Sequence, residues 1–430
     1  MGNPPFVGYS LQSKEQKQDL VDLFGKKWKN VGKMDYVSGW YLKATRLMNA
    51  SPKTHAALVS TNSITQGEQV ANLWQPLFKD WNAHIDFAYR TFRWDSEASL
   101  KAHVHCVIIG FSTCGSKQKT IYTESATPIQ AENINPYLID APTIWIESRN
   151  KSLCDVPQMV YGNKPVDGGF FFLTEAEKTE FLKKEPLSEK FIRQIYGSEE
   201  YINNKKRYCL WLVGASPMEL RKSPLIMERI ENIRQYRLNS TKEATRRDAE
   251  TPTLFQEIRH PNSEYIIVPR VSSENRRYVP IGFVTPEIIV NDSVQIIPNA
   301  TLYHFGILTS NVHMAWMRVV CGRLKSDYRY SKDIVYNNFP WPTPTEEQKS
   351  KIEQTAQAIL DVRAKHPESS LADLYDEVTM PPELRKAHKE NDKAVMQAYG
   401  FNATILSSDS ESQIVAELFR LYQTIIGQEQ

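Results

Sequence analysis

Residues 55–64 read HAALVSTNSI, an apolar run of strand length that ends in polar residues. A second run of this kind, HVHCVIIGF, occupies residues 103–111. In residues 35–48, DYVSGWYLKATRLM, apolar side chains recur at helical spacing instead. Buried strands separated by helices are typical of α/β proteins with a mostly parallel sheet. The sequence therefore predicts an α/β unit over residues 1–124.

The character of the sequence changes after this unit. Over residues 125–342, short strand-like runs such as TIWIES (143–148) and YIIVPRV (265–271) alternate with polar connections, which predicts a mixed α+β domain. Residues 343–430 are predicted to be helical. Thr345 and Gln348 have the spacing of a capping box there, and an apolar stripe follows at helical period.

The overall composition excludes several classes of protein. The 430 residues include 52 basic and 50 acidic ones, and 41% are hydrophobic, as in ordinary globular proteins. Five scattered cysteines without a CxxC pair argue against a zinc ribbon or a disulfide scaffold, and for a reducing compartment. No apolar run reaches membrane-spanning length, and no charged-then-apolar leader begins the chain. We expect a cytoplasmic protein with no membrane partner.

Residues 3–6 read NPPF, and this tetrapeptide (the NPPF segment) has an unusual set of hydrogen-bonding groups. Pro5 holds Pro4 extended, and because proline has no N–H, the Pro4 carbonyl oxygen is an acceptor outside a regular ladder. The Asn3 side-chain oxygen is a second acceptor, and Phe6 supplies an aromatic face. Two fixed acceptors can hold both hydrogens of an exocyclic amino group, with its lone pair aimed at an activated methyl, while a ring stacks on an extruded base. Amino-group methylation is one interpretation, and a proline-stiffened tail or turn is the other.

The NPPF segment resembles motif IV of amino-methyltransferases, and nearly the whole chain resembles one family of them. In order, its segments are similar to MmeI-like (type IIL restriction–modification) adenine methyltransferases; examples are MDYVSGWYLKAT (34–45), MVYGNKPVDGGFFFLT (159–174) and CGRLKSDYRYSKDIVYNNFPWP (321–342). The resemblance implies the second half of a Rossmann-like methyltransferase sheet, then an α+β target-recognition domain and a helical C-terminal region. The expected domains are therefore residues 1–124, 125–342 and 343–430.

The resemblance also implies an activity and a catalytic segment. It implies transfer of a methyl group from S-adenosylmethionine to N6 of a flipped adenine in double-stranded DNA, within a restriction–modification system. It assigns the catalytic role to the NPPF segment: Asn3 and Pro4 bind the amino group, Pro5 stiffens the backbone, and Phe6 stacks on the base.

Two parts of such an enzyme are not found in this sequence. Family members hold S-adenosylmethionine in a Gly-rich turn upstream of NPPF, because a tight turn needs glycine for close approach to the cofactor. The 18 glycines here include no GxG pair, and no paired carboxylates and lysine of the family's amino-terminal nuclease part are found. The chain resembles the carboxy-terminal part of a larger enzyme. We expect it neither to bind the methyl donor well nor to methylate DNA without the missing portions.

Residues 221–247 form a basic stretch within the expected recognition domain. Arg234, Arg237, Arg246 and Arg247 are candidates for neutralising DNA phosphates, and each such contact would steepen the salt dependence of binding. Glutamates are interleaved with these arginines, so a solvated helix with internal salt bridges is the competing interpretation.

The segment GRLKSDYRYS (322–331) follows a predicted helix over residues 311–323. Lys325, Asp327 and Arg329 alternate as on a strand and are predicted to project from one face into a groove. The family resemblance implies that Lys325 and Asp327 read the base pair beside the methylated adenine, and that Arg329 helps to read another pair. Because Lys donates to guanine and Asp accepts from cytosine N4, we expect the first two to specify a G·C pair. A surface ion pair is the competing interpretation.

Other polar residues give weaker indications. His103 and His105 share a strand face, but no third ligand has a suitable spacing, so no metal site is predicted. Asp35 is interpreted as a charge at a helix start. Asn62 and Ser63, at the end of the first strand, are either neighbours of the flipped base or a simple helix start.

Two functions of other classes remain open. The first is a DNA-binding specificity module without catalysis, which the missing cofactor turn favours. NPPF also occurs in methyltransferases acting on RNA bases or on protein glutamine. Those enzymes usually lack a long recognition domain with a Lys-x-Asp-x-Arg strand.

Overall fold

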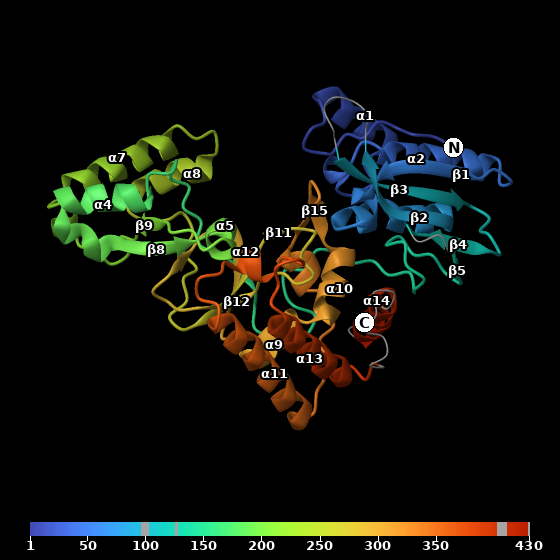
Figure 1. The fold of residues 1–430 in the computed structure, drawn as a ribbon. Coiled ribbons are helices and arrows are strands. Elements are labelled where there is room, and N and C mark those ends of the chain that lie inside the picture. Colours follow the sequence, from blue (N-terminus) through green and yellow to red (C-terminus); the bar gives the residue numbers. More distant parts are fainter. Residues whose placement is uncertain (96–102, 125–127, 402–410, 429–430) are drawn as a thin grey trace. The chain divides into compact units, whose positions relative to one another are not determined.

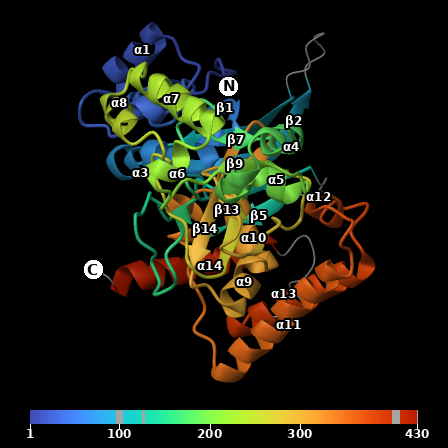
Figure 2. The ribbon, with the colours of Figure 1, turned by 90° about the vertical axis from the view of Figure 1, so that its left-hand side faces the viewer.

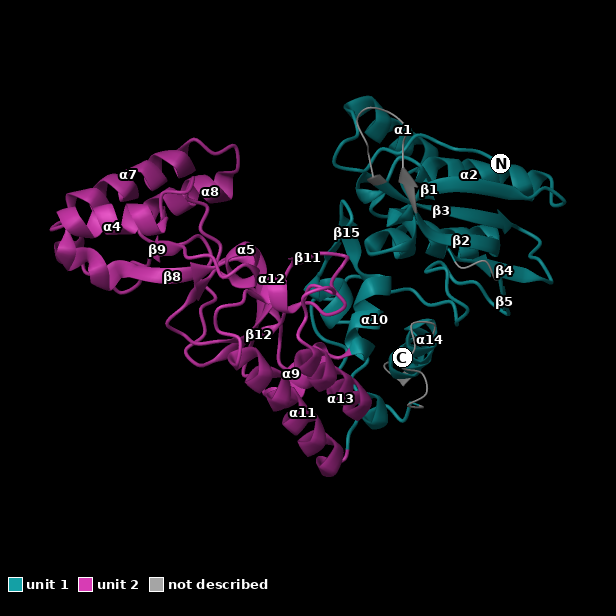
Figure 3. Ribbon diagram, in the orientation of Figure 1, with its two compact units in different colours: residues 1–155, 311–344, 396–430 teal, residues 156–310, 345–395 magenta. Residues whose placement is uncertain are grey.

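The computed structural model describes residues 1–95, 103–124, 128–401 and 411–428. The chain forms two compact units, each assembled from segments that are distant in sequence (Figures 1, 2 and 3). Unit 1 comprises residues 1–155, 311–344 and 396–430, and unit 2 comprises residues 156–310 and 345–395. Residues 311–344, at the end of the expected recognition domain, thus belong to the same unit as the expected catalytic residues.

Unit 1 contains a five-stranded sheet with the order β1-β3-β2-β4-β5. Its strands are β1 (Ala56–Thr61), β2 (His84–Asp95), β3 (His103–Ser112), β4 (Lys119–Tyr122) and β5 (Ile129–Ala131). The strands predicted within residues 55–64 and 103–111 are confirmed as β1 and β3. They are direct neighbours, with Leu58 opposite Ile109.

The prediction of a mostly parallel sheet is wrong for these strands. β3 pairs antiparallel with both β1 and β2, and β4 pairs antiparallel with β5, whereas β2 and β4 are parallel. The length of a connection explains the difference. Residues 96–102 alone separate β2 from β3, and a parallel crossover needs a dozen or more residues.

Helices and helical turns complete unit 1. They are α1 (Lys14–Phe24), η1 (Val31–Lys33), α2 (Ser38–Ala50), η2 (Asn62–Thr65), η3 (Val70–Trp74), α3 (Gln75–Trp81), α10 (Asn311–Val320), η6 (Lys332–Tyr336) and α14 (Glu411–Gln428). α2 packs on the sheet through Tyr41, whose ring stacks on Phe111 of β3 with centroids 5.1 Å apart. The Tyr41 hydroxyl is hydrogen bonded to the Ser60 hydroxyl at 2.7 Å, and Trp74 packs edge-on against both rings. This aromatic core fixes β1 and the segment that follows it.

α10 leads directly into a β-hairpin of unit 1, made of β15 (Gly322–Leu324) and β16 (Asp327–Arg329). The predicted helix ends at Val320 rather than at residue 323, because the chain enters β15 at Gly322. α10 is held by α14: Trp316 packs edge-on against Phe419 with centroids 5.7 Å apart, and Arg318 forms an ion pair with Glu411 at 2.7 Å. The hairpin therefore has a rigid helical base.

Unit 2 contains two four-stranded sheets, β12-β10-β14-β6 and β13-β8-β9-β7. The strands are β6 (Val160–Tyr161), β7 (Phe172–Leu173), β8 (Ile192–Tyr196), β9 (Tyr208–Leu210), β10 (Tyr265–Pro269), β12 (Gly282–Val284), β13 (Ile289–Val290) and β14 (Val294–Pro298), and a short β11 (Val271–Ser272) follows β10. The strand predicted in residues 265–271 is confirmed. Residues 143–148 form no strand, so that prediction is wrong.

The helices of unit 2 include a long C-terminal pair. The helical elements are α4 (Glu175–Lys184), η4 (Pro186–Phe191), α5 (Ser198–Ile202), α6 (Pro217–Leu220), α7 (Pro224–Leu238), α8 (Glu243–Arg247), η5 (Asp248–Glu250), α9 (Leu302–Leu308), α11 (Glu346–Ala364), α12 (Leu371–Leu374) and α13 (Pro382–Ala398), whose last residues count toward unit 1. The predicted capping box is confirmed, since the Thr345 N–H donates to Gln348 Oε1 at 2.9 Å and the Gln348 N–H donates to Thr345 Oγ1 at 3.2 Å. Gly306 lets α9 approach α11 closely, because a Cβ there would lie 2.6 Å from Cγ2 of Ile352 (Figure 2).

Candidate nucleic-acid interface

The NPPF segment lies beside β1 at the edge of the sheet in unit 1 (Figure 1). The Gly2 N–H donates to the Ala57 carbonyl at 3.0 Å, and the Val59 N–H donates to the Gly2 carbonyl at 3.0 Å, which is the pattern of parallel neighbours. Because both segments run in the same direction, the NPPF segment extends toward the carboxyl end of β1. Where neighbouring segments of an α/β sheet are parallel, as these two are, ligands bind at that end.

The acceptors predicted in the NPPF segment are open. Asn3 and Pro5 are exposed, Phe6 is half-buried and Pro4 is buried. Within the described ranges, no group donates a hydrogen bond to the Asn3 side chain or to the Pro4 carbonyl. Two acceptors and an aromatic face thus occur together at one strand end.

A buried carboxylate joins the loop after the NPPF segment to the end of β1. Asp35 is 7% exposed, and its Oδ1 accepts hydrogen bonds from the Tyr9 N–H at 3.2 Å and from Gln69 Nε2 at 3.3 Å. Its Oδ2 accepts from the Ser63 hydroxyl and, at 3.4 Å, from the Thr61 hydroxyl. Burial raises the pKa of Asp35, while the hydroxyl and backbone donors oppose the rise. The helix-start interpretation misses this role, since α2 has no side-chain cap.

The loop that follows β1 contains two buried side-chain amides, each with one atom that makes no hydrogen bond in the described ranges. Asn62 is 6% exposed and Gln66 is 8% exposed. Asn62 Nδ2 and Gln66 Oε1 are buried and have no hydrogen-bond partner in the part of the chain that the structure describes. Gly67 ends the loop with a φ of +57°, a conformation that glycine adopts without strain. Its N–H donates to the Val320 carbonyl at 3.0 Å, which joins the loop to the base of the β15–β16 hairpin.

The hairpin confirms one part of the sequence prediction and corrects another. Tyr328 and Tyr330 are buried, so Asp327 and Arg329, which alternate with them, lie on the opposite side of the chain from the core. Lys325 does not share their strand. It lies in the two-residue turn between β15 and β16 with a φ of 58°, because the strands pair up to the last residue before that turn.

The charged side chains of the hairpin are not neutralised by neighbours. Among the described residues, Lys325, Asp327 and Arg329 take part in no ion pair and no side-chain hydrogen bond. The Lys325–Asp327 ion pair proposed as the competing interpretation is therefore not formed. Arg323 instead stabilises the hairpin: its guanidinium stacks on Tyr328 at 4.4 Å and donates to the carbonyl of a turn residue at 2.6 Å.

The basic stretch of residues 221–247 lies in unit 2 and contains two helices, α7 and α8. Arg234, Arg246 and Arg247 are exposed there. Arg234 and Arg247 pair with glutamates one turn away, and Arg246 donates to a main-chain carbonyl at 2.9 Å. Surface pairs of this kind are weak, so these three arginines stay candidates for contacts with DNA phosphates.

Arg237 is a structural residue, and its prediction as a phosphate contact is wrong. The side chain is 0% exposed, and burial lowers the pKa of its guanidinium. Its guanidinium nitrogens donate at 2.7–3.0 Å to main-chain carbonyl oxygens of Pro165, Val166, Asp248, Thr251 and Leu254. These bonds satisfy the buried cation and join three segments of unit 2, so the side chain cannot face DNA.

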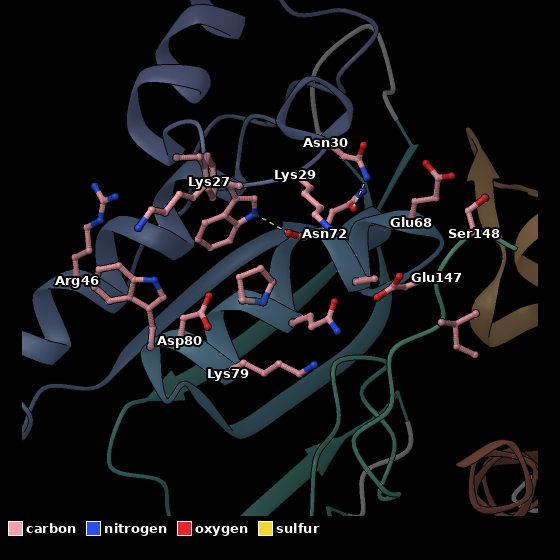
Figure 4. A pocket seen from close by; sticks show the side chains of 17 residues that line it. Lys27, Lys29, Asn30, Arg46, Glu68, Asn72, Lys79, Asp80, Glu147 and Ser148 are labelled. Carbon is pink, nitrogen blue, oxygen red and sulfur yellow. Dashed lines mark hydrogen bonds between the residues drawn. The ribbon is translucent and has the colours of Figure 1, made fainter. Parts of the chain in front are cut away.

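A cavity of about 570 Å³ lies in unit 1, next to the loop that follows β1 (Figure 4). Trp28 holds one wall, since its Nε1 donates to the Asn72 carbonyl at 2.7 Å. Lys27 and Arg46 lie at one end in Figure 4, and Glu68 and Glu147 lie at the other. This mixture of charges matches no single class of ligand.

Two other kinds of site are missing from the described ranges. No group of three or more His, Cys, Asp or Glu side chains there could hold a metal ion. None of the helices in those ranges is long and apolar enough to span a bilayer.

Three family models match the chain almost from end to end. They describe the "MmeI, DNA-methyltransferase domain" over residues 1–123, the "MmeI, target recognition domain" over residues 140–343 and the "MmeI, C-terminal domain" over residues 344–428. The chain belongs to the MmeI family. The resemblance inferred from its motifs is thereby confirmed.

Two similar proteins are longer than this chain. "DNA methyltransferase A" of Bacillus subtilis (strain 168) is 39% identical over 422 residues, which cover 98% of this chain and 47% of that protein. The structure of the type IIL restriction–modification enzyme MmeI in complex with DNA is 46% identical, with a TM-score of 0.90 over 99% of this chain and 57% of that chain. The α/β fold with a recognition domain and a helical C-terminal region is confirmed. The chain spans about half the length of these relatives.

The contacts that hold the MmeI-like site together are not evident from the sequence. Asp35, Gly67 and the partner of Gly67, Val320, come from segments that are far apart in the sequence. The available signal is the run of polar residues directly after β1, which includes Asn62 and Ser63.

Proposed function

We propose that this chain is the part of a DNA adenine-N6 methyltransferase that binds the target base and selects the site, within a restriction–modification system. One observation carries this proposal. The open acceptors of Asn3 and Pro4 and the charged β15–β16 hairpin belong to one compact unit, and the hydrogen bond from Gly67 to Val320 joins their supporting segments. Residues 1–124, 125–342 and 343–430 are the proposed catalytic, target-recognition and C-terminal domains.

The NPPF segment would bind the extruded adenine. Asn3 Oδ1 and the Pro4 carbonyl accept the two hydrogens of the N6 amino group, so its lone pair points away from both acceptors. Phe6 stacks on the base and replaces part of the stacking lost on extrusion, a contact worth about 1–3 kcal/mol. Pro5 keeps the acceptors in place because its ring fixes the backbone.

The residues proposed to bind the base do not bind the methyl donor. S-adenosylmethionine supplies the methyl group when it is bound, but the chain has no GxG pair for a close turn around it. We therefore propose that the 430 residues alone do not methylate DNA. The additional length found in the relatives is the proposed source of the donor site and of a nuclease portion.

The hairpin would read bases near the adenine. Lys325 donates to O6 and N7 of guanine, and Asp327 accepts from N4 of the paired cytosine, which together specify a G·C pair. Arg329 is left free to contact a further base pair. The absence of internal partners for these three side chains within the described ranges supports a role in contact with a ligand.

A binding selection tests this function. The chain is mixed with random DNA duplexes, bound duplexes are separated by gel shift, and their sequences are read. We expect an enriched motif that contains an adenine with a G·C pair beside it. Equal recovery of all sequences, or preference for RNA, would contradict the proposal.

A non-catalytic specificity module is the second candidate, which the missing GxG pair favours. Titration of the chain with S-adenosylmethionine partly distinguishes the methyltransferase from the specificity module. We expect no tight binding by this chain alone, and tight binding would show that the donor site is complete here.

A further inference from the structure

We propose that Asn62 recognises a ring nitrogen of the extruded adenine. This inference rests on the proposed function and supplies a contact that the NPPF segment lacks. Asn3 and Pro4 contact an exocyclic amino group, and cytosine carries one as well. Flipped bases are identified by further hydrogen bonds to their edges. A donor to a ring nitrogen would distinguish adenine from a base that merely has an amino group.

Asn62 lies where such a donor is needed. Gly2 is opposite Leu58 in a parallel pair, and β1 ends at Thr61, so Asn62 follows the strand end toward which the NPPF segment runs. Asn62 begins η2 directly at the carboxyl end of β1. The tetrapeptide and Asn62 therefore end at the same edge of the sheet.

The residues on both sides of Asn62 are held by hydrogen bonds, whereas its own amide nitrogen makes none within the described ranges. Thr61 and Ser63 both donate to Asp35, which also accepts from the Tyr9 N–H in the loop after the NPPF segment. Asn62 is nine-tenths buried, and its Nδ2 has no hydrogen-bond partner among the described residues. The backbone around this amide is thus held in place relative to the tetrapeptide.

An open donor in a buried position calls for an explanation. Buried polar groups in native proteins are nearly always hydrogen bonded, because an unsatisfied donor costs free energy. The ring nitrogens N1, N3 and N7 of adenine are acceptors that an amide N–H can satisfy. Gln66 Oε1, the other buried amide atom of this loop without a partner in the described ranges, is an acceptor, so of these two atoms only Asn62 Nδ2 can donate to a ring nitrogen. The chemistry of the loop therefore assigns the ring-nitrogen contact to Asn62.

The loop is also fixed relative to the hairpin. Gly67 closes it and donates to the Val320 carbonyl at the end of α10. A base held by Asn62 would consequently keep a constant spacing from a base pair read by the hairpin.

Deaza analogues test the contact directly. The duplex enriched by the wild-type chain is prepared with adenine, 1-deaza-, 3-deaza- or 7-deazaadenine at the target position, opposite an abasic site that lowers the cost of extrusion. Dissociation constants are measured for the wild type, Asn62→Asp and Asn62→Ala. Asp has the shape of Asn but its carboxylate cannot donate.

We expect the wild type to lose about tenfold in affinity on one of the three analogues, as for one hydrogen bond. Both Asn62 variants should lose about as much on adenine, and should bind adenine and that analogue equally well. Asn49→Asp in α2 adds the same charge in unit 1 and should leave the wild-type discrimination unchanged. Thermal unfolding of each variant shows whether it is folded.

The outcomes separate this inference from the proposed function. If the wild type prefers its duplex but loses no affinity on any analogue, or if the variants keep the wild-type discrimination, Asn62 makes no such contact. The first of these results concerns the wild type alone, so it counts against the contact even if both variants fail to fold. If the wild type shows no duplex preference at all, the proposed function fails, and this inference fails with it.

Discussion

The backbone N–H of Gly67 donates a 3.0 Å hydrogen bond to the carbonyl oxygen of Val320. Gly67 ends the loop after β1, beside the NPPF segment, and Val320 is the last residue of α10, directly before the charged hairpin. One bond thus connects the supports of two candidate sites that are far apart in the sequence. Since both lie in unit 1, the expected base-binding and base-reading residues belong to one compact unit.

Gly67→Ala should weaken this connection. A Cβ at Gly67 would be in ordinary contact with Gly322, at 3.4 Å, so the cost comes from the φ of +57° and amounts to about 1–2 kcal/mol. We expect a lower temperature of thermal unfolding together with reduced discrimination among duplexes. Gly400→Ala is the control, because Gly400 also lies in unit 1, has a φ of +72°, and its added Cβ would meet no atom within 4 Å. Identical discrimination by the two variants would show that the connection has no role in recognition.

Asp35 should make stability depend on pH. Burial raises its pKa in the folded chain, so the folded state holds the proton more tightly than the unfolded state does. The stability that this group contributes is greatest below its ordinary pKa and is lost as pH rises from about 4 through the raised value. Asp35→Asn should gain stability relative to the wild type over that range, as measured by urea denaturation at a series of pH values. A difference between the two proteins that stays constant with pH would contradict the expectation.

Arg237 and Arg234 should respond very differently to replacement by alanine. Arg237→Ala removes a buried cation and leaves its carbonyl partners without donors, and we expect a loss of about 3 kcal/mol or more in the free energy of unfolding. Arg234→Ala, on the exposed side of the same helix, should change it by less than about 0.5 kcal/mol. Chemical denaturation of both variants measures the difference. Similar stabilities would show that the buried bonds contribute little.

Local features of the fold were predictable from the sequence, whereas features that depend on distant partners were not. β1, β3 and the capping box at Thr345 follow from short-range patterns, and all three are present. The sheet direction depends on how β2 connects to β3, which an apolar run does not reveal. Arg237 looked like its exposed neighbours because its carbonyl partners lie in residues 165–166 and 248–254.

The candidate site shows the same division. The NPPF segment is local, and no group in the described part of the chain donates to its two predicted acceptors. Alternation along residues 327–330 predicted correctly that Asp327 and Arg329 face away from the core. The same alternation misplaced Lys325, because strand periodicity carries no sign of a two-residue turn where no glycine marks it. Asp35 and Gly67 act through contacts that only the folded chain brings together.

Exchange of the two hairpin charges, Lys325→Asp with Asp327→Lys, tests the central claim most directly. The wild type and the exchanged variant are both selected against random duplexes, and the bound sequences are compared. Lys17→Asp with Asp19→Lys, an exposed pair of the same spacing on α1, is the matched control. We predict that the exchange inverts guanine to cytosine at one position beside the enriched adenine, with about 1–3 kcal/mol of discrimination, while the control keeps the wild-type motif. An unchanged motif, or equal loss of binding on all sequences, would contradict base reading by this hairpin.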